Sequence, residues 1–289
     1  MAYYLAIDVG GTFIKYGKVN TDGQLFSKNQ LATPYNEQAA IVSTVHEIVT
    51  RTIADEGKPS GIGISTAGVV DTDSGEVIYA GPTIPNYNGT NFKQYLEATF
   101  NIPVTVNNDV NAALLGEQWQ GAAKDQSDVY CITLGTGIGG AYFHNQLVTG
   151  TGSKAGEVGY LLYDQQTQTT YEQRASTSAL KERAEQEYGK SVNLIELFAS
   201  AKAKDAASNR IIDAWASDVA AGLAQIIIIV DPKLLLIGGG ISQQGDFLLG
   251  KIARYIDDFL PENFSQTELR CTALGNDAAL LGAVSHYFN

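Results

Sequence analysis

Asn108 and Asp109 are the residues whose types and positions most suggest chemistry, because they lie where an apolar run at 102–106 meets a helical run at 110–118. A carboxylate at such a junction can take the proton of a bound hydroxyl group. The same position also suits a helix N-cap, whose side-chain oxygen accepts backbone N–H groups. The pair alone leaves both interpretations open, so the surrounding motifs decide between them.

Two glycine-rich turns of similar plan open the two halves of the chain. Each lies between strand-like runs: 3–7 and 13–19 around the turn at 8–12, and 130–134 and 141–148 around the turn at 135–140. Gly135, Gly137 and Gly140 have the spacing of a dinucleotide fingerprint, but that fingerprint needs a following helix, and here a strand follows. The repeat predicts a duplicated α/β unit whose turns expose backbone N–H groups to phosphate oxygens. A tight hairpin without a ligand would read in the same way.

Two loops between the hairpins have the composition of binding segments. A strand over 61–65 leads into a loop at 66–71, where Gly68 would let a ligand approach the backbone closely. The segment 81–89, which contains Asn86, is rich in Pro, Asn and Gly and is longer than a simple connection needs. Loops of this kind often carry function.

The second half of the chain ends in a regular series of elements. The expected elements are a helix over 210–230 stopped by Asp231-Pro232, a buried strand over 234–237, and a final helix over 278–288 capped by 275–277. Gly238, Gly239 and Gly240 follow the strand directly. This bare backbone is either a surface for a flat ring or a flexible link into the next helix.

Composition limits the partners. The 289 residues are 44% hydrophobic and 17% charged, which is typical of a soluble globular chain with one or two domains. The net charge of −12 argues against nucleic-acid and anionic-membrane surfaces and favours small molecules. Cys131 and Cys271 lie in apolar runs, so we interpret them as reduced thiols of a cytoplasmic protein.

No targeting or spanning segment is expected. The start of the chain has no basic region before Asp8, which excludes a secretory signal. The longest apolar stretch, 226–230, is cut short by Asp231-Pro232, so we expect no membrane span.

In their order along the chain, these motifs resemble those of the ROK family (repressors, open reading frames, kinases), which shares the actin and hexokinase fold. The segments at 8–12, 135–140 and 238–240 are similar to the family's two phosphate loops and its adenosine loop. The segment 108–112 is similar to its sugar-binding and catalytic segment. The resemblance covers essentially the whole chain, and several motifs in the right order are more specific than one.

The resemblance implies an α/β, two-domain, actin/hexokinase-like fold (ribonuclease H-like, duplicated) with a central cleft. A smaller N-terminal domain over 1–115 would be rejoined by 276–289, and a larger one would span 116–275. It also implies an ATP-dependent sugar kinase that uses Mg²⁺, binds neither nucleic acid nor membrane, and forms a homodimer.

The resemblance further assigns roles to single residues. Asp109 would be the general base, Asn108 would orient the sugar, and Asp8 would hold Mg²⁺ through water. The nucleotide would contact Gly10, Gly11, Thr12, Lys15, Gly135, Thr136, Gly137, Gly139, Gly238, Gly239 and Gly240. The sugar site would include Gly68, Asn86, Asn108, Asp109, Glu157, Tyr160 and Glu172.

The chain departs from the family at the zinc site. Many members have a Glu-x-Gly-His stretch followed by a cysteine cluster, whereas this chain reads Glu157-Val158-Gly159-Tyr160 with no cysteine nearby. Three His and two Cys, all scattered, cannot form the usual four-ligand site, so we predict no zinc. Glu157 and Glu172 match sugar-binding glutamates of the family, although either could be a solvated surface charge.

Tyr160 in place of His resembles the β-glucoside kinases of the family, which phosphorylate the 6-hydroxyl of the non-reducing glucose in disaccharides such as cellobiose. Trp119-Gln120-Gly121 and the ending 275–284 also resemble that subgroup. The ring could stack on a second pyranose or replace the packing of the missing zinc loop. A monosaccharide kinase acting on glucose, fructose or an N-acetylhexosamine therefore remains open.

The alternative of another class is a sugar-binding protein without catalysis. Repressors of the family carry an N-terminal helix-turn-helix, and this chain enters its first strand at Tyr3 with an acidic composition. A catalytically silent sugar sensor with the same fold is disfavoured because Asp109 is present.

Overall fold

Two compact units make up the chain in the computed structural model, which describes residues 2–81 and 84–288. Unit 1 comprises Met1–Asp125, Thr149–Lys154 and Asn276–Asn289, and unit 2 comprises Gln126–Val148 and Ala155–Gly275. Two residues of the predicted loop at 81–89, numbers 82 and 83, lie outside the described residues, as do residues 1 and 289 at the ends of the predicted smaller domain.

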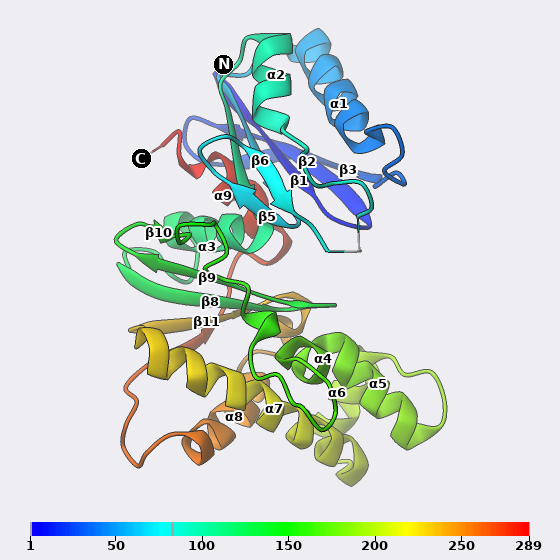
Figure 1. Ribbon diagram of the computed structural model, residues 1–289, viewed down its shortest axis with the longest axis vertical. Coiled ribbons are helices and arrows are strands. Elements are labelled where there is room, and N and C mark those ends of the chain that lie inside the picture. Colours follow the sequence, from blue (N-terminus) through cyan, green and yellow to red (C-terminus); the bar gives the residue numbers. More distant parts are fainter. Residues whose placement is uncertain (1, 82–83, 289) are drawn as a thin grey trace. The chain divides into compact units, whose positions relative to one another are not determined.

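A five-stranded sheet forms the centre of unit 1 (Figure 1). Its strands are β1 (Tyr3–Val9), β2 (Phe13–Asn20), β3 (Leu25–Ala32), β4 (Gly61–Thr66) and β7 (Val104–Asn108). Their order is β3-β2-β1-β4-β7, with β1 antiparallel to β2 and parallel to β4. The first predicted hairpin is confirmed. Strand β1 extends beyond its predicted end at residue 7 to include Asp8 and Val9, which were predicted in the turn, and β4 extends beyond residue 65 to Thr66.

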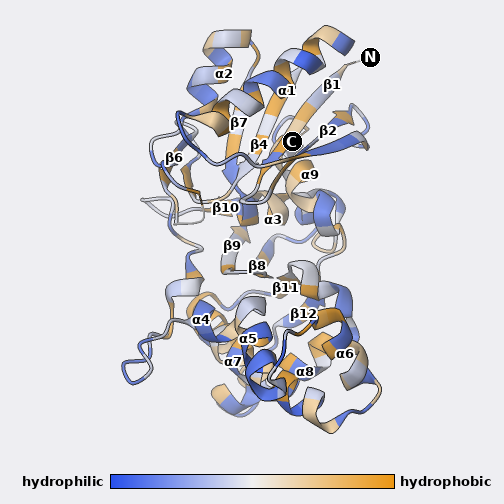
Figure 2. Ribbon diagram, turned by 90° about the vertical axis from the view of Figure 1, so that its right-hand side faces the viewer, coloured by the Kyte–Doolittle hydropathy of each residue, from blue (hydrophilic) through white to orange (hydrophobic). Residues whose placement is uncertain are grey.

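Helices cover both faces of this sheet. They are α1 (Ala40–Glu56), α2 (Phe92–Phe100), α3 (Asp109–Gln120) and α9 (Ala278–Ser285), with the 3₁₀ turn η4 at Gly275–Asp277. Apolar residues of α1 and α2 join the strands in one core, and α9 packs on β1 and β4 (Figure 1). Figure 2 shows the hydrophobic colouring of β1, β4 and β7. A Cβ on Gly282 would lie 1.7 Å from the Ala112 carbonyl oxygen, so glycine is needed where α9 meets α3.

Two sequence predictions for unit 1 are wrong in part. Residues 66–71 are not a loop, because Thr66 ends β4 and Val69–Asp71 forms β5, which pairs with β6 (Glu76–Tyr79). The last helix ends at Ser285 instead of continuing to 288.

Unit 2 repeats the plan of unit 1. Its strands are β8 (Asp128–Leu134), β9 (Ile138–His144), β10 (Leu147–Val148), β11 (Leu234–Gly238) and β12 (Glu268–Cys271). Their order is β10-β9-β8-β11-β12, with β8 antiparallel to β9 and parallel to β11. The equivalent order of strands in both sheets confirms the predicted duplication.

The second glycine turn is shorter than predicted. It spans Gly135–Gly137, because Ile138 pairs with Leu134 and so belongs to β9 together with Gly139 and Gly140. The predicted strand at 141–148 is also interrupted, between His144 and Leu147. Strand pairing supplies hydrogen bonds to a segment whose composition resembles a turn.

The helices of unit 2 pack around one long member. They are α4 (Tyr171–Ala175), α5 (Thr177–Tyr188), α6 (Leu194–Lys202), α7 (Ala206–Val230) and α8 (Asp246–Ile256), with 3₁₀ turns η1 (Val158–Tyr160), η2 (Gly240–Gln244) and η3 (Asp257–Phe259). By length and composition alone α7 could cross a membrane, yet 61% of its most apolar window is buried in the structure, and it contacts α4, α5, α6 and α8. It is the core helix of this unit.

Candidate active site

Asp8 is a buried carboxylate near the end of the central strand of unit 1. The parallel register of β1 and β4 places Ser65 beside it, and the Ser65 hydroxyl donates to Asp8 Oδ1 at 2.8 Å. Lys15 Nζ lies 3.6 Å from Asp8 Oδ2. Burial raises the pKa of the Asp8 carboxyl, and the Ser65 hydrogen bond and the Lys15 charge oppose that rise. A single carboxylate fits Mg²⁺, which keeps most of its waters.

The turn that follows Asp8 is fixed from two sides. The Gly10 N–H donates to the Phe13 carbonyl at 3.0 Å, which closes the turn. The Thr33 hydroxyl donates to the Gly10 carbonyl at 2.6 Å, and the Thr33 N–H donates to the Thr12 carbonyl at 2.9 Å. Gly11 and Thr12 are exposed at the tip. This backbone fits the phosphate loop that the sequence predicts.

Asn108, not Asp109, is the N-cap of α3. Asn108 Oδ1 accepts the N–H groups of Val110 at 2.9 Å and Asn111 at 3.2 Å. Its Nδ2 donates to the Gly68 carbonyl at 2.8 Å and to Asp109 Oδ1 at 3.0 Å. The interpretation of Asp109 as a capping residue is therefore wrong, since Asp109 is the first helical residue. Its half-buried carboxylate is oriented by its neighbour and by the Val110 N–H at 2.9 Å.

Gly68, which lies between β4 and β5, is hydrogen-bonded to the junction of β7 and α3. Its φ of 96° and the Tyr79 carbonyl, 2.7 Å from where a Cβ would be, both require glycine. The Gly68 carbonyl is the acceptor of the Asn108 amide, so the loop and the predicted base are held together. The sequence predicts that a ligand approaches the backbone at Gly68. The structure adds a conformational reason for glycine at this position.

The loop that contains Asn86 is held by a residue that the sequence did not single out. Asn36, which is buried, donates from Nδ2 to the carbonyls of Pro85 at 3.1 Å and Asn86 at 3.2 Å. Asn86 itself is exposed, with a φ of 54°. A surface pocket is lined by this loop, at Ala80, Gly81, Ile84, Pro85, Asn86, Tyr87 and Asn88.

Tyr87 is a second residue that the sequence analysis missed. Its buried hydroxyl lies 2.6 Å from the Thr66 hydroxyl. Burial raises the pKa of Tyr87, and the negative charge of Asp109 adds to that rise. Both Tyr87 and Asn36 act through contacts distant in sequence, which a local motif does not reveal.

In unit 2, the predicted phosphate turn is attached to the segment that carries Glu172. The Ile138 N–H donates to Glu172 Oε2 at 2.8 Å, and the Thr177 N–H donates to the Gly135 carbonyl at 2.9 Å. Thr136 is exposed at the tip. Gly139 lies within β9, opposite Thr133, and not in the turn where the sequence placed it. Glu172 is half-buried, which makes it more than a solvated surface charge.

Glu157 directly precedes the 3₁₀ turn η1, and Tyr160 is the last residue of that turn. The pKa of Glu157 is raised by partial burial and by the negative charge of Glu172. The two predicted sugar-binding glutamates are therefore electrostatic neighbours. Tyr160 is 60% exposed, so much of this residue lies on the surface of unit 2.

The three glycines at the end of β11 form a bare corner of backbone, and the first of them lies in the strand instead of following it as predicted. Gly238 ends the strand, and Gly239 has a φ of 87° with the Leu134 carbonyl oxygen 2.3 Å from where a Cβ would be. A Cβ on Gly240 would meet open space. Only glycine fits at Gly239, and the exposed backbone at Gly239 and Gly240 fits the predicted adenosine loop.

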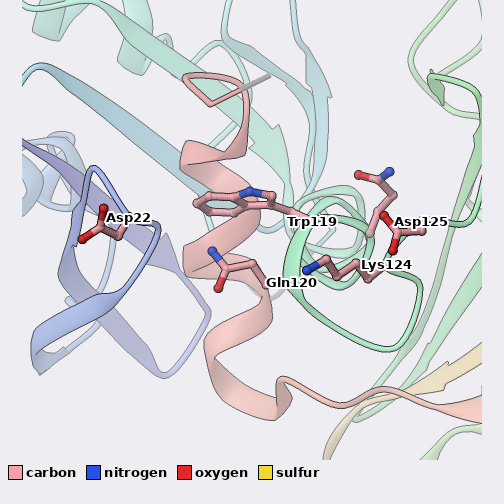
Figure 3. A pocket seen from close by; sticks show the side chains of 6 residues that line it. Asp22, Trp119, Gln120, Lys124 and Asp125 are labelled. Atoms are coloured by element: carbon pink, nitrogen blue, oxygen red, sulfur yellow. The ribbon is translucent and has the colours of Figure 1, made fainter.

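A separate pocket in unit 1 contains none of the predicted site residues. It is lined by Asp22, Gln118, Trp119, Gln120, Lys124 and Asp125. Figure 3 shows Trp119 and Gln120 between Asp22 and the Lys124–Asp125 pair. Trp119 packs on Phe288 with ring centroids 4.6 Å apart, and Gln120 Nε2 donates to the Gly23 carbonyl at 2.8 Å. These contacts give the Trp119-Gln120 motif a packing role.

The described residues include no group of three or more His, Cys, Asp or Glu side chains arranged to hold a metal ion.

The sequence model of the ROK family matches residues 4–287. The chain belongs to the ROK family. A β-glucoside kinase of Listeria monocytogenes is 31% identical over 291 residues, which cover 98% of this chain and 96% of that protein.

Two solved structures are also similar to this ROK-family chain. A ROK-family glucokinase of Streptomyces griseus in complex with glucose and AMPPNP is 29% identical, with a TM-score of 0.84 and 98% of each chain covered. A ROK-family protein of Streptococcus pneumoniae in complex with sucrose is 25% identical, with a TM-score of 0.85, and covers 99% of this chain and 97% of that chain. These neighbours confirm the predicted α/β fold of the actin and hexokinase type.

Proposed function

We propose that this ROK-family protein is an ATP-dependent sugar kinase, and that its acceptor is the 6-hydroxyl of a β-glucoside such as cellobiose. The observation that carries the proposal is the Asp109 carboxylate, which the Asn108 amide and the Val110 N–H hold at the junction of β7 and α3. Similarity to a glucokinase with bound glucose and AMPPNP and to a β-glucoside kinase supports phosphoryl transfer from ATP to a sugar.

Within unit 1 we assign deprotonation of the acceptor to Asp109. Phosphoryl transfer needs positioning, charge neutralisation and a base at the attacking oxygen, with little covalent chemistry by the protein. Asp8 would hold Mg²⁺ through water, and the turn at Gly10–Thr12 with Lys15 would contact phosphate oxygens. The metal, when bound, neutralises charge on the phosphates. Gly68, Asn86 and Asn108 are the proposed sugar-side residues of this unit.

Within unit 2 we assign nucleotide contacts to the turn at Gly135–Gly137 and to the glycines at 238–240. Glu157 and Glu172 are the proposed acceptors of sugar hydroxyl hydrogens, for which carboxylates are suited because they accept strong hydrogen bonds. The exposed ring of Tyr160 would lie against a second pyranose. That last assignment favours a disaccharide over a monosaccharide.

The second candidate acceptor is a monosaccharide, and the Streptomyces griseus glucokinase with bound glucose supports it. The test is ADP release with Mg-ATP across cellobiose, gentiobiose, glucose, fructose, mannose, N-acetylglucosamine and N-acetylmannosamine. Asp109→Asn should lower the rate by about 10²–10⁴-fold, the usual cost of losing a general base. Asp125→Asn, an exposed Asp of the same unit, is the matched control and should leave the rate unchanged.

Tyr160→Ala separates the two acceptors. Tyr163 is exposed to a similar extent, 59% against 60%, so Tyr163→Ala controls for loss of a surface ring. Turnover of disaccharides that Tyr160→Ala weakens and Tyr163→Ala does not would support the β-glucoside assignment. Turnover of monosaccharides alone would overturn it. Sugar binding without ADP release anywhere in the panel would instead favour a non-catalytic sensor.

A further inference from the structure

The turn at Gly135–Gly137 is held at both ends by one segment of unit 2. On one side, Glu172 Oε2 accepts the Ile138 N–H at 2.8 Å. On the other side, the Thr177 N–H donates to the Gly135 carbonyl at 2.9 Å. Glu172 belongs to α4 and Thr177 begins α5, so the two attachments are five positions apart in the sequence. The conformation of the turn therefore depends on the α4–α5 junction.

The Glu172 carboxylate is closely packed against two glycines. A Cβ on Gly137 would lie 2.5 Å from Glu172 Oε2, and a Cβ on Gly159 would lie 3.2 Å from the same atom. Gly159 belongs to η1, which directly follows Glu157. The carboxylate thus lies against both the phosphate turn and the η1 turn, and a side chain at Gly137 would displace it.

Helix α4 is itself anchored to the core helix of the unit. The buried Tyr171 hydroxyl donates to the Val219 carbonyl at 2.9 Å, and Trp215 Nε1 donates to the Ala175 carbonyl at 2.9 Å. A Cβ on Gly222 would lie 2.2 Å from the Tyr171 ring, so glycine in α7 permits this close approach. These contacts at both ends of α4 fix the backbone that carries Glu172.

We infer that Glu172 is a positioning residue for the nucleotide turn, in addition to any contact it makes with the sugar. Its charged oxygen accepts the Ile138 N–H and so stabilises the turn whose tip, Thr136, is exposed. A residue that only bound sugar would not affect nucleotide binding when no sugar is present. The inference rests on the proposed function, because it takes the turn to be a nucleotide site.

The test measures binding of AMPPNP with Mg²⁺ by titration calorimetry in the absence of sugar. Glu172→Ala should weaken binding about tenfold, since a hydrogen bond to a charged acceptor typically contributes that much. Glu172→Gln keeps an oxygen that accepts the Ile138 N–H but loses the charge, so its affinity should fall less than that of Glu172→Ala. Glu182→Ala, an exposed glutamate of α5, is the matched control and should not change binding.

Thr177→Pro tests the other attachment and leaves Glu172 in place. Thr177 is the first residue of α5, where proline is favoured, and the preceding Ser176 is extended, with φ −68° and ψ 166°. The substitution removes the N–H that Gly135 accepts, and it should also weaken AMPPNP binding. Hydrogen exchange of the Ile138 amide gives a readout without ligand: it should be faster in Glu172→Ala than in wild type and restored in Glu172→Gln.

The outcomes separate this inference from the proposed function. Wild-type protein that does not bind AMPPNP would refute the nucleotide site itself. Wild-type binding that is unchanged in Glu172→Ala would overturn the positioning role of Glu172 and leave the kinase proposal standing. If Glu172→Ala does not fold, Glu172→Leu, which keeps the bulk of the side chain and loses the acceptor, replaces it: weakened AMPPNP binding supports the role, and unchanged binding overturns it.

Discussion

Replacing Asn108 tests whether the proposed base depends on its neighbour. Asn108→Asp keeps an oxygen that can cap α3 but loses both Nδ2 hydrogen bonds, to Gly68 and to Asp109. Asn108→Ala also loses the cap. The two variants therefore separate the stability of the helix start from the orientation of the Asp109 carboxylate.

The magnitudes follow from the contacts. In Asn108→Asp, a carboxylate oxygen would replace the amide nitrogen that is 3.0 Å from Asp109 Oδ1. Two unit charges at that distance repel by about 1.4 kcal/mol even at the dielectric constant of water, which corresponds to about one pH unit. The acidic limb of the pH–rate profile should move to higher pH by at least that amount. Asp109 is half-buried, and the repulsion is stronger where the dielectric constant is lower than that of water.

Asn108→Ala should lower stability as well, because it loses the cap in addition to both Nδ2 hydrogen bonds. It removes the acceptor of the Val110 and Asn111 N–H groups, although Val110 keeps Asp109 Oδ1 at 2.9 Å. We therefore expect a loss of about 1 kcal/mol, in the middle of the range for N-cap removal. The expected fall in Tm is roughly 2–4 °C, as for domains of this size.

The assay is initial-rate ADP release between pH 5 and 9 on the best sugar of the panel, with a thermal scan of each variant. Asn91→Asp is the matched control, since Asn91 caps α2 by accepting the Gln94 N–H at 2.8 Å. A wild-type pH profile in Asn108→Asp would refute the view that the Asn108 amide holds the base. A shifted profile in Asn91→Asp would show that the effect is not specific to the site.

Three further predictions concern charge and packing. The raised pKa of Asp8 means that its ionised form destabilises the folded chain. This penalty is absent in acid below the ordinary pKa of 3.8 and complete above the pKa of the folded state. Asp8→Asn should therefore raise Tm at neutral pH while abolishing Mg-AMPPNP binding, and a lower Tm would contradict this. The raised pKa of Glu157 should make KM for the sugar rise on acidification at a higher pH than an ordinary glutamate would, and Glu172→Gln should move that rise to lower pH, as initial rates across pH would show. Gly282→Ala should destabilise unit 1 by at least about 2 kcal/mol in calorimetry, since its Cβ would meet the Ala112 carbonyl, and an unchanged melting curve would show that α9 can move away from α3.

The two hairpins were predictable because alternating apolar residues around a glycine turn determine both strands and their pairing locally. The exact end of a turn was not. Residues 138–140 contain two glycines and resemble a continuing turn, but the pairing of Ile138 with Leu134 places them in β9. Pairing with a neighbouring strand overrides the local preference of glycine.

The site residues were predictable to a similar depth. The motif identified the Asn108-Asp109 junction but assigned the cap to the wrong member, because the deciding fact is backbone conformation: Asn108 is extended, with φ −60° and ψ 150°. Ser65 was missed because its role depends on the parallel register that places it beside Asp8. Asn36 was missed because it holds a loop about 50 residues away, at Pro85 and Asn86.

The two glycine turns show what the duplication kept and what it changed. In each turn the first glycine uses its N–H to close the turn: Gly10 donates to Phe13, and Gly135 donates to Gly137. The N–H of the first glycine therefore has a conformational role. The proposed hydrogen-bond donors to phosphate are the N–H groups of the residues that follow it, Gly11 and Thr12 in unit 1 and Thr136 and Gly137 in unit 2.

The supports of the two turns have diverged. Unit 1 uses the neutral hydroxyl and N–H of Thr33, whereas unit 2 uses the charged carboxylate of Glu172 together with the Thr177 N–H. A neutral support keeps negative charge away from the turn next to Asp8. The Glu172 carboxylate is tolerated at the second turn because the Ile138 N–H, which lies outside the tip, donates a hydrogen bond to it. Moving a carboxylate to the first turn, as in Thr33→Glu, should therefore weaken Mg-AMPPNP binding, whereas Thr33→Ser, which keeps the hydroxyl, should bind as wild type does.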